Sequence, residues 1–473
     1  MEKMTVSEFQ ERIRSQHVTV LGLGISNRPV LDFLLSCGAV VEGRDKNDSA
    51  EMREFAAKLE KKGIATVLGD TYLDGIEADW IFKAPGIRRD LPELLQAEKN
   101  GCVLTSEMEV FFALCPCPII AVTGSAGKTT TTTLTYLSLE EQARIDASDR
   151  RVFVGGNIGA PLLPQIAEIR PCDAVVVELS SFQLHAMNFS ADRAAITNLS
   201  PNHLNWHTDM TEYVEAKKTV FRYQSQDGLL VLGADSEPTD AIRAEAPGHC
   251  TVFSVTKKPS FDHCDAVVYY ENGCLYHETK DKKECMLRCG TVILPGRHNL
   301  ANFAAVCALL HGIVSPEAIQ HVADTFRGVR HRLELIREKD GVKYYNSSID
   351  SSPDRTEAAL SVFAKNVVLI LGGSDKNIPF DPLAKPVCAH AKAVVLTGAS
   401  AEKLRAALCG SEDFQKAGIP LYQEPTFDLA VRRAADCAKG GDVVLLSPAC
   451  ASFDAFRNFE HRGDTFRAIV ESL

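Results

Sequence analysis

The chain has 473 residues, of which 45% are hydrophobic and 24% are charged, and its formal net charge is −11. This length predicts about three domains, each large enough to have its own core. The acidic balance argues against nucleic acid as a partner, because phosphate backbones are bound by clustered positive charge. No apolar run approaches the ~18 residues that span a membrane, and the first residues lack the apolar core of a signal peptide. We therefore expect a cytoplasmic protein with no membrane partner, and we expect it to be a monomer.

The first region, residues 1–104, alternates short apolar strands with helical patterns, which predicts a parallel sheet with right-handed crossovers. Its first strand leads into the glycine turn Gly22-Leu-Gly-Ile-Ser-Asn27, and Asp45 ends the second strand. This arrangement imitates a dinucleotide fingerprint, in which an acid about 20 residues further on binds a ribose hydroxyl. Because Asn27 occupies the position of the third glycine, a nicotinamide cofactor is disfavoured. Another nucleotide is expected there, with a plain tight turn as the alternative.

The second region, residues 105–328, opens with an apolar strand that runs into Thr123-Gly-Ser-Ala-Gly-Lys-Thr129. Glycines let backbone N–H groups close around phosphate oxygens, and the helix that follows adds the positive end of its dipole. In such a loop Lys128 reaches the terminal phosphates, and the Thr129 hydroxyl can ligate Mg²⁺. The strict pattern has a glycine where this chain has Val122, so the first glycine here is Gly124. The loop predicts a site for a nucleoside triphosphate rather than an ordinary strand-to-helix turn.

Three more polar residues of this region follow apolar segments or lie on a helix. Glu178 ends the strand 174–177, where parallel sheets place ligand groups, and a carboxylate there is a natural Mg²⁺ ligand. His203 could bind metal or phosphate, although a single histidine is more often a packed or surface residue. Lys217 lies on a helix that Asp209 and Glu212 begin as a capping box, and by itself a lysine there indicates a solvated face.

The third region, residues 329–473, again alternates strands with helices, and its unbroken apolar strands predict burial on both faces. Arg332 stands at its beginning, where the guanidinium fork suits phosphate, and Asn299 precedes it on an alanine-rich helix. Polar segments at 372–376 and 447–463 follow two strands and suit an anionic amino acid. The predicted fold class is α/β with three domains: a Rossmann-like first domain, a central ATPase-type domain with the phosphate loop, and a Rossmann-like third domain.

The 15 cysteines are an odd number and include no Cys-x-x-Cys pair, which is typical of reduced thiols in a cytosolic chain. A zinc site is the alternative for one segment, whose histidines and cysteines are His263, Cys264, Cys274, His277, Cys285 and Cys289. Their irregular spacing, in a stretch that alternates like short strands, argues against zinc.

Taken in order, these motifs resemble the Mur ligase family, the ATP-dependent amide-forming enzymes of peptidoglycan assembly. The resemblance runs from Gly22 to Arg462 and, besides the phosphate loop, includes Gly155-Gly-Asn-Ile-Gly159, Glu178-Leu-Ser-Ser-Phe-Gln183, Asn202-His203, Tyr213-x-x-x-Lys217, His298-Asn299 and His331-Arg332. The tail from Ser447 to Gly463 is similar to that of the members that add D-glutamate. The Asp-Asn-Pro-Arg signature of the members that add diaminopimelate or lysine is absent from the sequence.

The resemblance implies which residues bind each reactant. ATP would be bound by Gly124, Ser125, Ala126, Gly127, Lys128, Thr129, Thr130, Asn299 and Arg332. UDP-N-acetylmuramoyl-L-alanine would be bound through its UDP by Ser26, Asp45 and Lys46, and through its muramoyl-alanine arm by Asn157, Ser180 and Gln183. D-Glutamate would be bound by Ser351, Lys376, Ser452, Phe453 and Phe459. Two Mg²⁺ ions would lie near Thr129, Glu178, His203 and Lys217, with Lys217 carbamylated by CO₂, and the catalytic residues would be Lys128, Lys217 and His203.

The implied reaction begins when the alanine carboxylate attacks the γ-phosphate of ATP, and D-glutamate then displaces phosphate from the acyl phosphate. The chain departs from the family at the start of the third domain, where many members have Asn-Asp-Ser-Lys and this sequence has Asn346-Ser-Ser-Ile349. One ATP-ribose contact and one substrate contact lose their usual residues, and Asp350 and Asp354 are the candidates to replace them. The alternatives are a UDP-sugar-binding sensor without catalysis and a related ligase that adds L-glutamate to folate.

Overall fold

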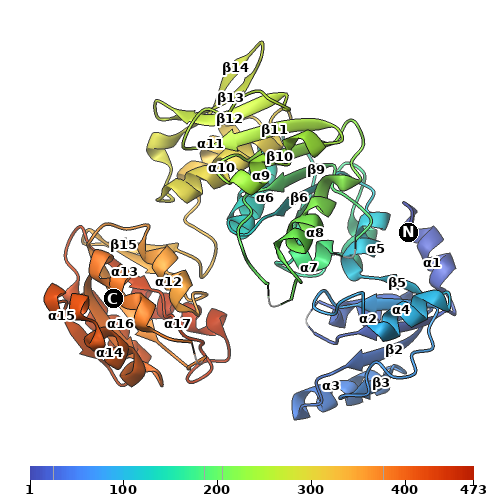
Figure 1. Cartoon of the computed structure of the whole chain (residues 1–473), viewed down its shortest axis with the longest axis horizontal. Helices are drawn as coiled ribbons and strands as arrows, with labels where there is room; N and C mark the ends of the chain where they lie inside the picture. The colour runs from blue at the N-terminus through green and yellow to red at the C-terminus, as the bar shows by residue number, and fades with distance from the viewer. Residues whose placement is uncertain (25, 186, 205, 377) are drawn as a thin grey trace. The chain divides into compact units, whose positions relative to one another are not determined.

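The computed structural model describes residues 1–24, 26–185, 187–204, 206–376 and 378–473. Within these residues the chain forms three sheets, which lie in the blue, the cyan-to-yellow and the orange-to-red parts of Figure 1. Contacts divide the chain into two compact units. Unit 1 comprises Met1–Thr291 and Arg297–Asp324 and contains the first two sheets, whereas unit 2 comprises Val292–Gly296 and Thr325–Leu473 and contains the third.

The first sheet has five parallel strands in the order β3-β2-β1-β4-β5. The strands are β1 (His17–Leu21), β2 (Val40–Asp45), β3 (Ala65–Leu68), β4 (Trp80–Lys83) and β5 (Val103–Thr105). The helices are α1 (Val6–Ile13), α2 (Arg28–Ser36), α3 (Ala50–Glu60) and α4 (Pro92–Lys99). The strand order reverses between β1 and β4, and in open α/β sheets ligands bind at the carboxyl ends of the strands beside such a reversal.

The central sheet has nine strands in the order β14-β13-β12-β11-β10-β9-β6-β8-β7. Seven are parallel: β6 (Ile119–Thr123), β7 (Val152–Gly156), β8 (Ala174–Glu178), β9 (Arg193–Ile196), β10 (Leu229–Gly233), β11 (His249–Ser254) and β12 (Ala266–Glu271). The last two, β13 (Cys274–Thr279) and β14 (Lys283–Arg288), are antiparallel. The α-helices are α5 (Glu107–Leu114), α6 (Lys128–Ile145), α7 (Ser181–Leu184), α8 (Met210–Arg222), α9 (Glu237–Asp240), α10 (Arg297–Leu310) and α11 (Pro316–Thr325), and the 3₁₀ turns are η1 (Leu163–Glu168), η2 (Arg243–Glu245) and η3 (Cys289–Thr291).

The third sheet has six strands in the order β15-β16-β20-β17-β18-β19, and only β15 is antiparallel. The strands are β15 (Glu334–Lys339), β16 (Val342–Asn346), β17 (Val367–Gly372), β18 (Ala391–Thr397), β19 (Leu421–Gln423) and β20 (Val443–Leu446). The helices are α12 (Pro353–Leu360), η4 (Asp381–Leu383), α13 (Ala384–His390), α14 (Ala401–Gly410), α15 (Glu412–Ala417), α16 (Phe427–Cys437) and α17 (Phe459–Ser472). Along β17, Leu369 packs into one apolar cluster and Ile370 into another, so the sheet is covered on both faces as its apolar strands predict.

All eight residues of α5 are buried, and α5 comes just after the predicted domain boundary at residue 104. Phe111 and Phe112 of this helix belong to one apolar core that includes Val20 of β1 and Val175 of β8. The α/β class with three mostly parallel sheets is confirmed, while the domain boundaries after residues 104 and 328 stay predictions. In the described part of the chain, none of the helices has the length and apolar content that crossing a bilayer requires.

Candidate functional site

The phosphate loop lies between β6 and α6 at the middle of the central sheet. Gly124 has φ +144° and Gly127 has φ +82°, which favour glycine. Close packing gives a second reason, because a Cβ at Gly124 would lie 2.0 Å from Thr197 Oγ1 and one at Gly127 would lie 2.5 Å from Asn302 Oδ1. The Lys128 ammonium donates to the carbonyl oxygens of Gly124, at 3.0 Å, and Ser125, at 3.2 Å. The loop therefore has its lysine folded over the turn in which a phosphate would bind.

Neighbouring segments hold this loop in place. Asn198 Oδ1 accepts a hydrogen bond from the Ala126 N–H at 2.9 Å, and the Thr197 hydroxyl donates to the Ala126 carbonyl at 2.6 Å. The Ser125 hydroxyl lies 2.9 Å from the Tyr213 hydroxyl. These bonds come from the segment after β9 and from α8, so the loop is held by elements distant in sequence.

Glu178 and Asn157 lie at the carboxyl ends of the strands beside the loop. Glu178 is almost fully buried at the end of β8, and in the strand register it is opposite Val122 of β6. Its Oε1 accepts a hydrogen bond from Asn157 Nδ2 at 2.8 Å, but its Oε2 has no partner among the described residues. A buried carboxylate oxygen without a partner among the described residues is a donor that fits Mg²⁺.

Lys217 is buried in α8 and is not on the solvated face that its helix position suggests. Its ammonium nitrogen lies 3.1 Å from Thr123 Oγ1 and 3.0 Å from the Gly124 carbonyl oxygen. It also lies 4.8 Å from the centre of the Tyr213 ring. Burial, and then the positive charge of Lys128, hold the pKa of Lys217 well below its usual range, against the opposing effect of Glu178. Both effects disfavour the ammonium form of Lys217 relative to the neutral amine.

His203 is exposed, with φ +55°, and its ring centre lies 4.9 Å from that of Phe182. Its predicted place beside Lys217 at a second Mg²⁺ stays a prediction. Nearby, His207 is the buried histidine of this segment, and its Nε2 lies 2.9 Å from Ser181 Oγ. The side chain of Glu212 accepts from the Thr208 N–H, so only the Asp209 half of the expected capping box forms.

The segment around His207 is joined to the loop after β4 by a cluster that sequence reasoning missed. Arg88 pairs with Glu212 at 2.8 Å and donates to the Trp206 carbonyl at 2.8 Å. The Arg88 guanidinium, with additional hydrogen bonds from the Thr208 N–H and from His185, holds the pKa of Glu212 well below its usual range. No periodic pattern links Arg88 to residues more than 100 positions away, so only the folded chain shows this contact.

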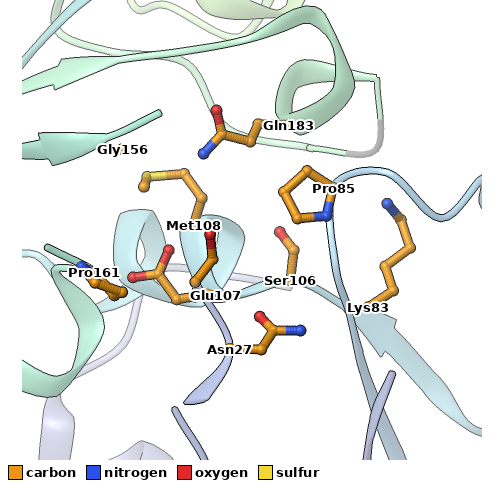
Figure 2. Close-up of a pocket in the computed structure, with 10 residues that line it drawn as sticks. Asn27, Lys83, Pro85, Ser106, Glu107, Met108, Gly156, Pro161 and Gln183 are labelled. Carbon is orange, nitrogen blue, oxygen red and sulfur yellow. The ribbon is translucent and has the colours of Figure 1, made fainter. Parts of the chain in front are cut away.

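A small pocket lies among the residues drawn in Figure 2. The predicted substrate residues Ser26 and Gln183 line it, and Gln183 also forms a capping box with Ser180 at the start of α7. Asp45 instead accepts the Leu23 N–H of the glycine turn at 2.6 Å, so it shapes the turn directly. Lys46 is exposed, and its contact with UDP stays a prediction.

Asn299 and Asn302 share a face of α10, as their spacing predicts, and the amide nitrogen of Asn302 donates to Asn299 Oδ1 at 3.3 Å. Asn302 is the residue that reaches the phosphate loop, because its Oδ1 accepts from the Thr131 hydroxyl at 3.3 Å and closely approaches Gly127. It was not among the predicted ATP residues. The three-residue separation puts both asparagines on one face of the helix, which could have indicated Asn302. The sequence does not show which of the two contacts the phosphate loop.

In unit 2, two of the residues predicted to bind D-glutamate are in contact. The Lys376 ammonium donates to Ser351 Oγ at 2.8 Å, and burial, then the nearby charges of Arg355 and Arg462, lower the pKa of Lys376. Ser452 is buried, whereas Phe453 is 73% exposed. The Phe453 ring is therefore open to solvent, and its contact with D-glutamate stays a prediction.

Phe459 begins α17, and the backbone before and within this helix is held by Arg462. Arg462 is 1% exposed and donates four hydrogen bonds of 2.8 to 3.1 Å, two to Ser348 and one each to the Ala451 and Cys450 carbonyls. It is thus a structural residue of the tail motif, and it positions the segment that contains Ser452.

Buried hydroxyl side chains occur at the start of the third domain, where the sequence departs from the family pattern. Ser347 and Ser348 are buried, and Asp350 accepts a hydrogen bond from Ser447 Oγ at 2.8 Å. Burial raises the pKa of Asp350 to about 6, although the Ser347 and Ser447 hydroxyls and the positive charge of Arg332 act in the opposite direction. Asp350 therefore lies near the arginine predicted to hold ATP, while Asp354 lies in the first turn of α12.

Within the described ranges, no group of histidine, cysteine or acidic side chains forms a metal site, so zinc at 263–289 finds no support.

Comparison with known proteins gives the family. The description "Mur ligase middle domain" matches residues 122–310, and "Mur ligase, glutamate ligase domain" matches residues 331–450. The chain is 44% identical to the UDP-N-acetylmuramoylalanine–D-glutamate ligase of Clostridium novyi (strain NT) over all of both chains. It is also 44% identical to the enzyme of that name from Acetivibrio thermocellus, over 99% of each.

Among solved structures, the fold is similar to that of UDP-N-acetylmuramate-alanine ligase MurC from Thermotoga maritima, with a TM-score of 0.56 and 21% identity over 97% of this chain and 99% of that one. At this identity the similarity concerns the fold alone. The sequence identities and the matched domains together show that the chain belongs to the Mur ligase family and, within it, to the group of UDP-N-acetylmuramoylalanine–D-glutamate ligases.

Proposed function

We propose that this protein joins D-glutamate to the L-alanine carboxylate of UDP-N-acetylmuramoyl-L-alanine, with ATP as the energy source, in the cytoplasmic part of peptidoglycan synthesis. The observation that supports it best is the grouping of Lys128, Glu178 and Lys217 around the glycines of the phosphate loop. A protein that only bound a UDP-sugar would have no use for a second nucleotide site of this kind. The phosphate loop therefore favours the ligase over the sensor.

Phosphoryl transfer gathers negative charge, because the alanine carboxylate must approach the γ-phosphate of ATP. Lys128 and the loop backbone would offset part of this charge, and Arg332 of unit 2 is proposed to add another cation. Bound Mg²⁺ would supply further charge neutralisation, and the residues proposed to hold it are Thr129, Glu178 and, at a second site, His203 and Lys217. The unpartnered Glu178 Oε2 supports the first of these sites.

Lys217 has a distinct proposed role. An ammonium between Lys128 and the loop would repel Mg²⁺, whereas the low pKa of Lys217 favours the free amine. The amine nitrogen can attack CO₂ to form a carbamate with loss of one proton, and this converts a potential cation into an anion. Tyr213 packs beside the Lys217 amine and the Thr123 hydroxyl lies within hydrogen-bond distance, so these groups would orient the carbamate.

The acyl phosphate formed on alanine would then be attacked by the amine of D-glutamate. We assign the glutamate carboxylates to Lys376 and to the backbone around Ser452, and Phe453 and Phe459 to the walls of that site. The contact of Lys376 with Ser351 supports this grouping, because both residues belong to the predicted set. Asn157, Ser180 and Gln183 are proposed to contact the muramoyl-alanine arm.

The decisive experiment measures ADP release from ATP and Mg²⁺ with UDP-N-acetylmuramoyl-L-alanine, with and without D-glutamate, and with L-glutamate as a control. We expect release that requires D-glutamate and that falls at least about a hundredfold in Lys128→Ala, since one preorganised donor to a transition-state charge has about this effect. Lys218→Ala, which removes the neighbouring partly buried lysine, is the matched control and should keep its activity.

Two results would contradict the proposal. Tight binding of the UDP-substrate without ADP release would leave the sensor, and release that depends on L-glutamate would indicate the related ligase. The same assay in CO₂-depleted buffer tests the carbamate, because activity should fall and return when bicarbonate is added. Activity unaffected by CO₂ depletion would argue against the proposed modification of Lys217.

A further inference from the structure

Lys83 is a buried cation of unit 1 for which the proposed reaction has so far given no role. It is 2% exposed at the end of β4, and its ammonium has no hydrogen-bond or ion-pair partner within the described ranges. A buried charge without a partner is costly, so such a residue is expected either to lose its proton or to meet a counter-ion. Glu109 attracts Lys83 but forms no ion pair with it, so a bound anionic ligand would be its direct counter-ion.

The position of Lys83 in the sheet indicates which ligand. In the parallel register Lys83 is opposite Leu21 of β1, so its backbone lies next to the start of the glycine turn at Gly22. This edge is beside the reversal in strand order between β1 and β4, where α/β sheets bind nucleotides. The phosphate loop for ATP lies on the other sheet of unit 1, after β6. A second nucleotide is thus the expected ligand at Lys83.

The groups around Lys83 favour an anion. Figure 2 shows Lys83 together with Asn27, Ser106 and Glu107, and Ser26 lines the same pocket. The hydroxyls and the amide can donate to phosphate oxygens. The Asn27 amide already donates to the Leu21 and Gly22 carbonyls, which fixes it against the turn and leaves the serines and the lysine for a ligand.

The carboxylates near Lys83 already have other partners. Both oxygens of Glu109 accept hydrogen bonds, from Thr105 and from Asn188. Glu107 Oε1 accepts the N–H groups of Leu162 and Leu163, and burial raises the pKa of Glu107 to about 7. Neither acid forms an ion pair with the lysine, so the Lys83 ammonium is left to pair with an anionic ligand.

We propose that Lys83 binds the diphosphate of the UDP-linked substrate, an assignment that rests on the ligase function proposed above. A diphosphate combines two adjacent negative charges with acceptor oxygens, which suits one ammonium and two serine hydroxyls. The alternative anion on the same substrate is the alanine carboxylate. That group must reach the γ-phosphate at the other sheet, so the diphosphate is assigned to the glycine turn.

The test measures dissociation constants by titration calorimetry for wild type, Lys83→Met, Lys83→Arg and Lys99→Met. Methionine keeps the length and apolar stem of lysine, and Lys99 is an exposed lysine on α4 that serves as the matched control. The ligands are UDP-N-acetylmuramoyl-L-alanine and UDP-N-acetylglucosamine, which has the diphosphate but no carboxylate. Lys83→Met should lose at least about tenfold in affinity for both, as expected for a charge-assisted hydrogen bond, whereas ATP binding and the Lys99→Met variant should be unaffected. Lys83→Arg should recover part of the loss.

The pH profile separates a ligand contact from a structural effect. Burial, and then repulsion from Arg89, lower the pKa of Lys83 to about 8, against the attraction of Glu109. Above that pH the lysine is neutral, so wild-type affinity for UDP-N-acetylglucosamine should weaken as pH rises from 7.5 to 9.5 and binding should take up a proton. Glu107 and Glu109 are present in both proteins, so the difference between wild type and Lys83→Met isolates the lysine.

Each outcome bears on a different statement. Equal affinity of wild type and Lys83→Met for both ligands, or a loss confined to UDP-N-acetylmuramoyl-L-alanine, would overturn the diphosphate assignment while the ligase function stands. Absence of binding and of ADP release in the wild type would overturn the proposed function as well. If Lys83→Met fails to fold, as judged by circular dichroism, the wild-type pH profile and Lys83→Arg still decide, since a flat profile would contradict the proposal.

Discussion

Buried ionisable side chains in this protein are stabilised in different ways, and each way indicates a role. Arg462 remains among carbonyl oxygens, and although burial lowers its pKa to about 10, it stays charged at neutral pH. Lys217 has two oxygen partners but also faces Lys128, so its neutral form is favoured. Lys83 has no hydrogen-bond or ion-pair partner among the described residues, and we assign it a contact with a ligand. A buried charge with enough hydrogen-bond partners has a structural role here, whereas a buried charge without them indicates catalysis or ligand binding.

A glycine in the tail motif is explained by packing and gives a stability prediction. A Cβ at position 463 would lie 2.2 Å from His331 Nδ1 and 3.0 Å from Asn346 Nδ2, so Gly463→Ala should lower the free energy of unfolding of unit 2 by about 1–3 kcal/mol through overpacking. Gly410→Ala, at the end of α14 where a Cβ would meet nothing within 4 Å, is the matched control and should be neutral or stabilising. Urea denaturation followed by circular dichroism measures both. Equal stability of the two variants would show that His331 moves aside without cost.

Single residues also show what the sequence could and could not predict. The roles of Lys128 and Thr129 follow from a loop whose spacing is local, and Glu178 follows from its place at a strand end. Lys217 looks solvated in its helix pattern, and only the resemblance indicated a role, because its burial depends on contacts with β6. Lys83, Arg88 and Asn302 were missed for the same reason: their partners are far away in the sequence.

At the scale of elements, Glu107 connects α5 to the short turn η1. Its Oε1 accepts the N–H groups of Leu162 and Leu163 at 3.1 and 2.9 Å, where the first N–H groups of a helical turn lack partners within it. Because desolvation outweighs these two bonds, the pKa of Glu107 is raised to about 7 from an ordinary 4.5. The two hydrogen bonds favour the ionised carboxylate, but its burial costs more than they return, so folding favours the protonated carboxyl group.

This raised pKa predicts a dependence of stability on pH. Between pH 4.5 and 7 the folded protein binds the proton that the unfolded chain has released, so the contribution of Glu107 to stability is lost as pH rises through 7. Glu107→Gln keeps an acceptor oxygen without the charge. It should match the wild type near pH 4.5 and exceed it by up to about 3 kcal/mol above pH 7. Urea denaturation of unit 1 from pH 4.5 to 8 measures this, with exposed Glu11→Gln as the control. A gain that does not change with pH would contradict the role given to the carboxyl group.

At the scale of the whole molecule, the alternation of strands and helices was enough to predict three α/β sheets. Buried strands such as β17 have unbroken apolar runs that local sequence displays directly. The grouping of the first two sheets into one compact unit was not predicted, because it depends on α5. The predicted boundary after residue 104 comes directly before α5, yet all residues of α5 are buried, and several belong to a core shared by both sheets.

The two compact units should respond separately to ligands, and the tryptophans offer a way to see it. Both tryptophans of the chain, Trp80 and Trp206, belong to unit 1, so tryptophan fluorescence reports on its unfolding while circular dichroism reports on both units. UDP-N-acetylglucosamine at 100 times its dissociation constant should stabilise unit 1 by about 2.7 kcal/mol and raise the transition temperature seen by fluorescence. The transition of unit 2 is the one that circular dichroism detects and tryptophan fluorescence does not. Its transition temperature should not change with this ligand, and it should be lower in Gly463→Ala. A single transition in which both signals shift together would show that the units unfold as one, since independent units share no unfolding equilibrium.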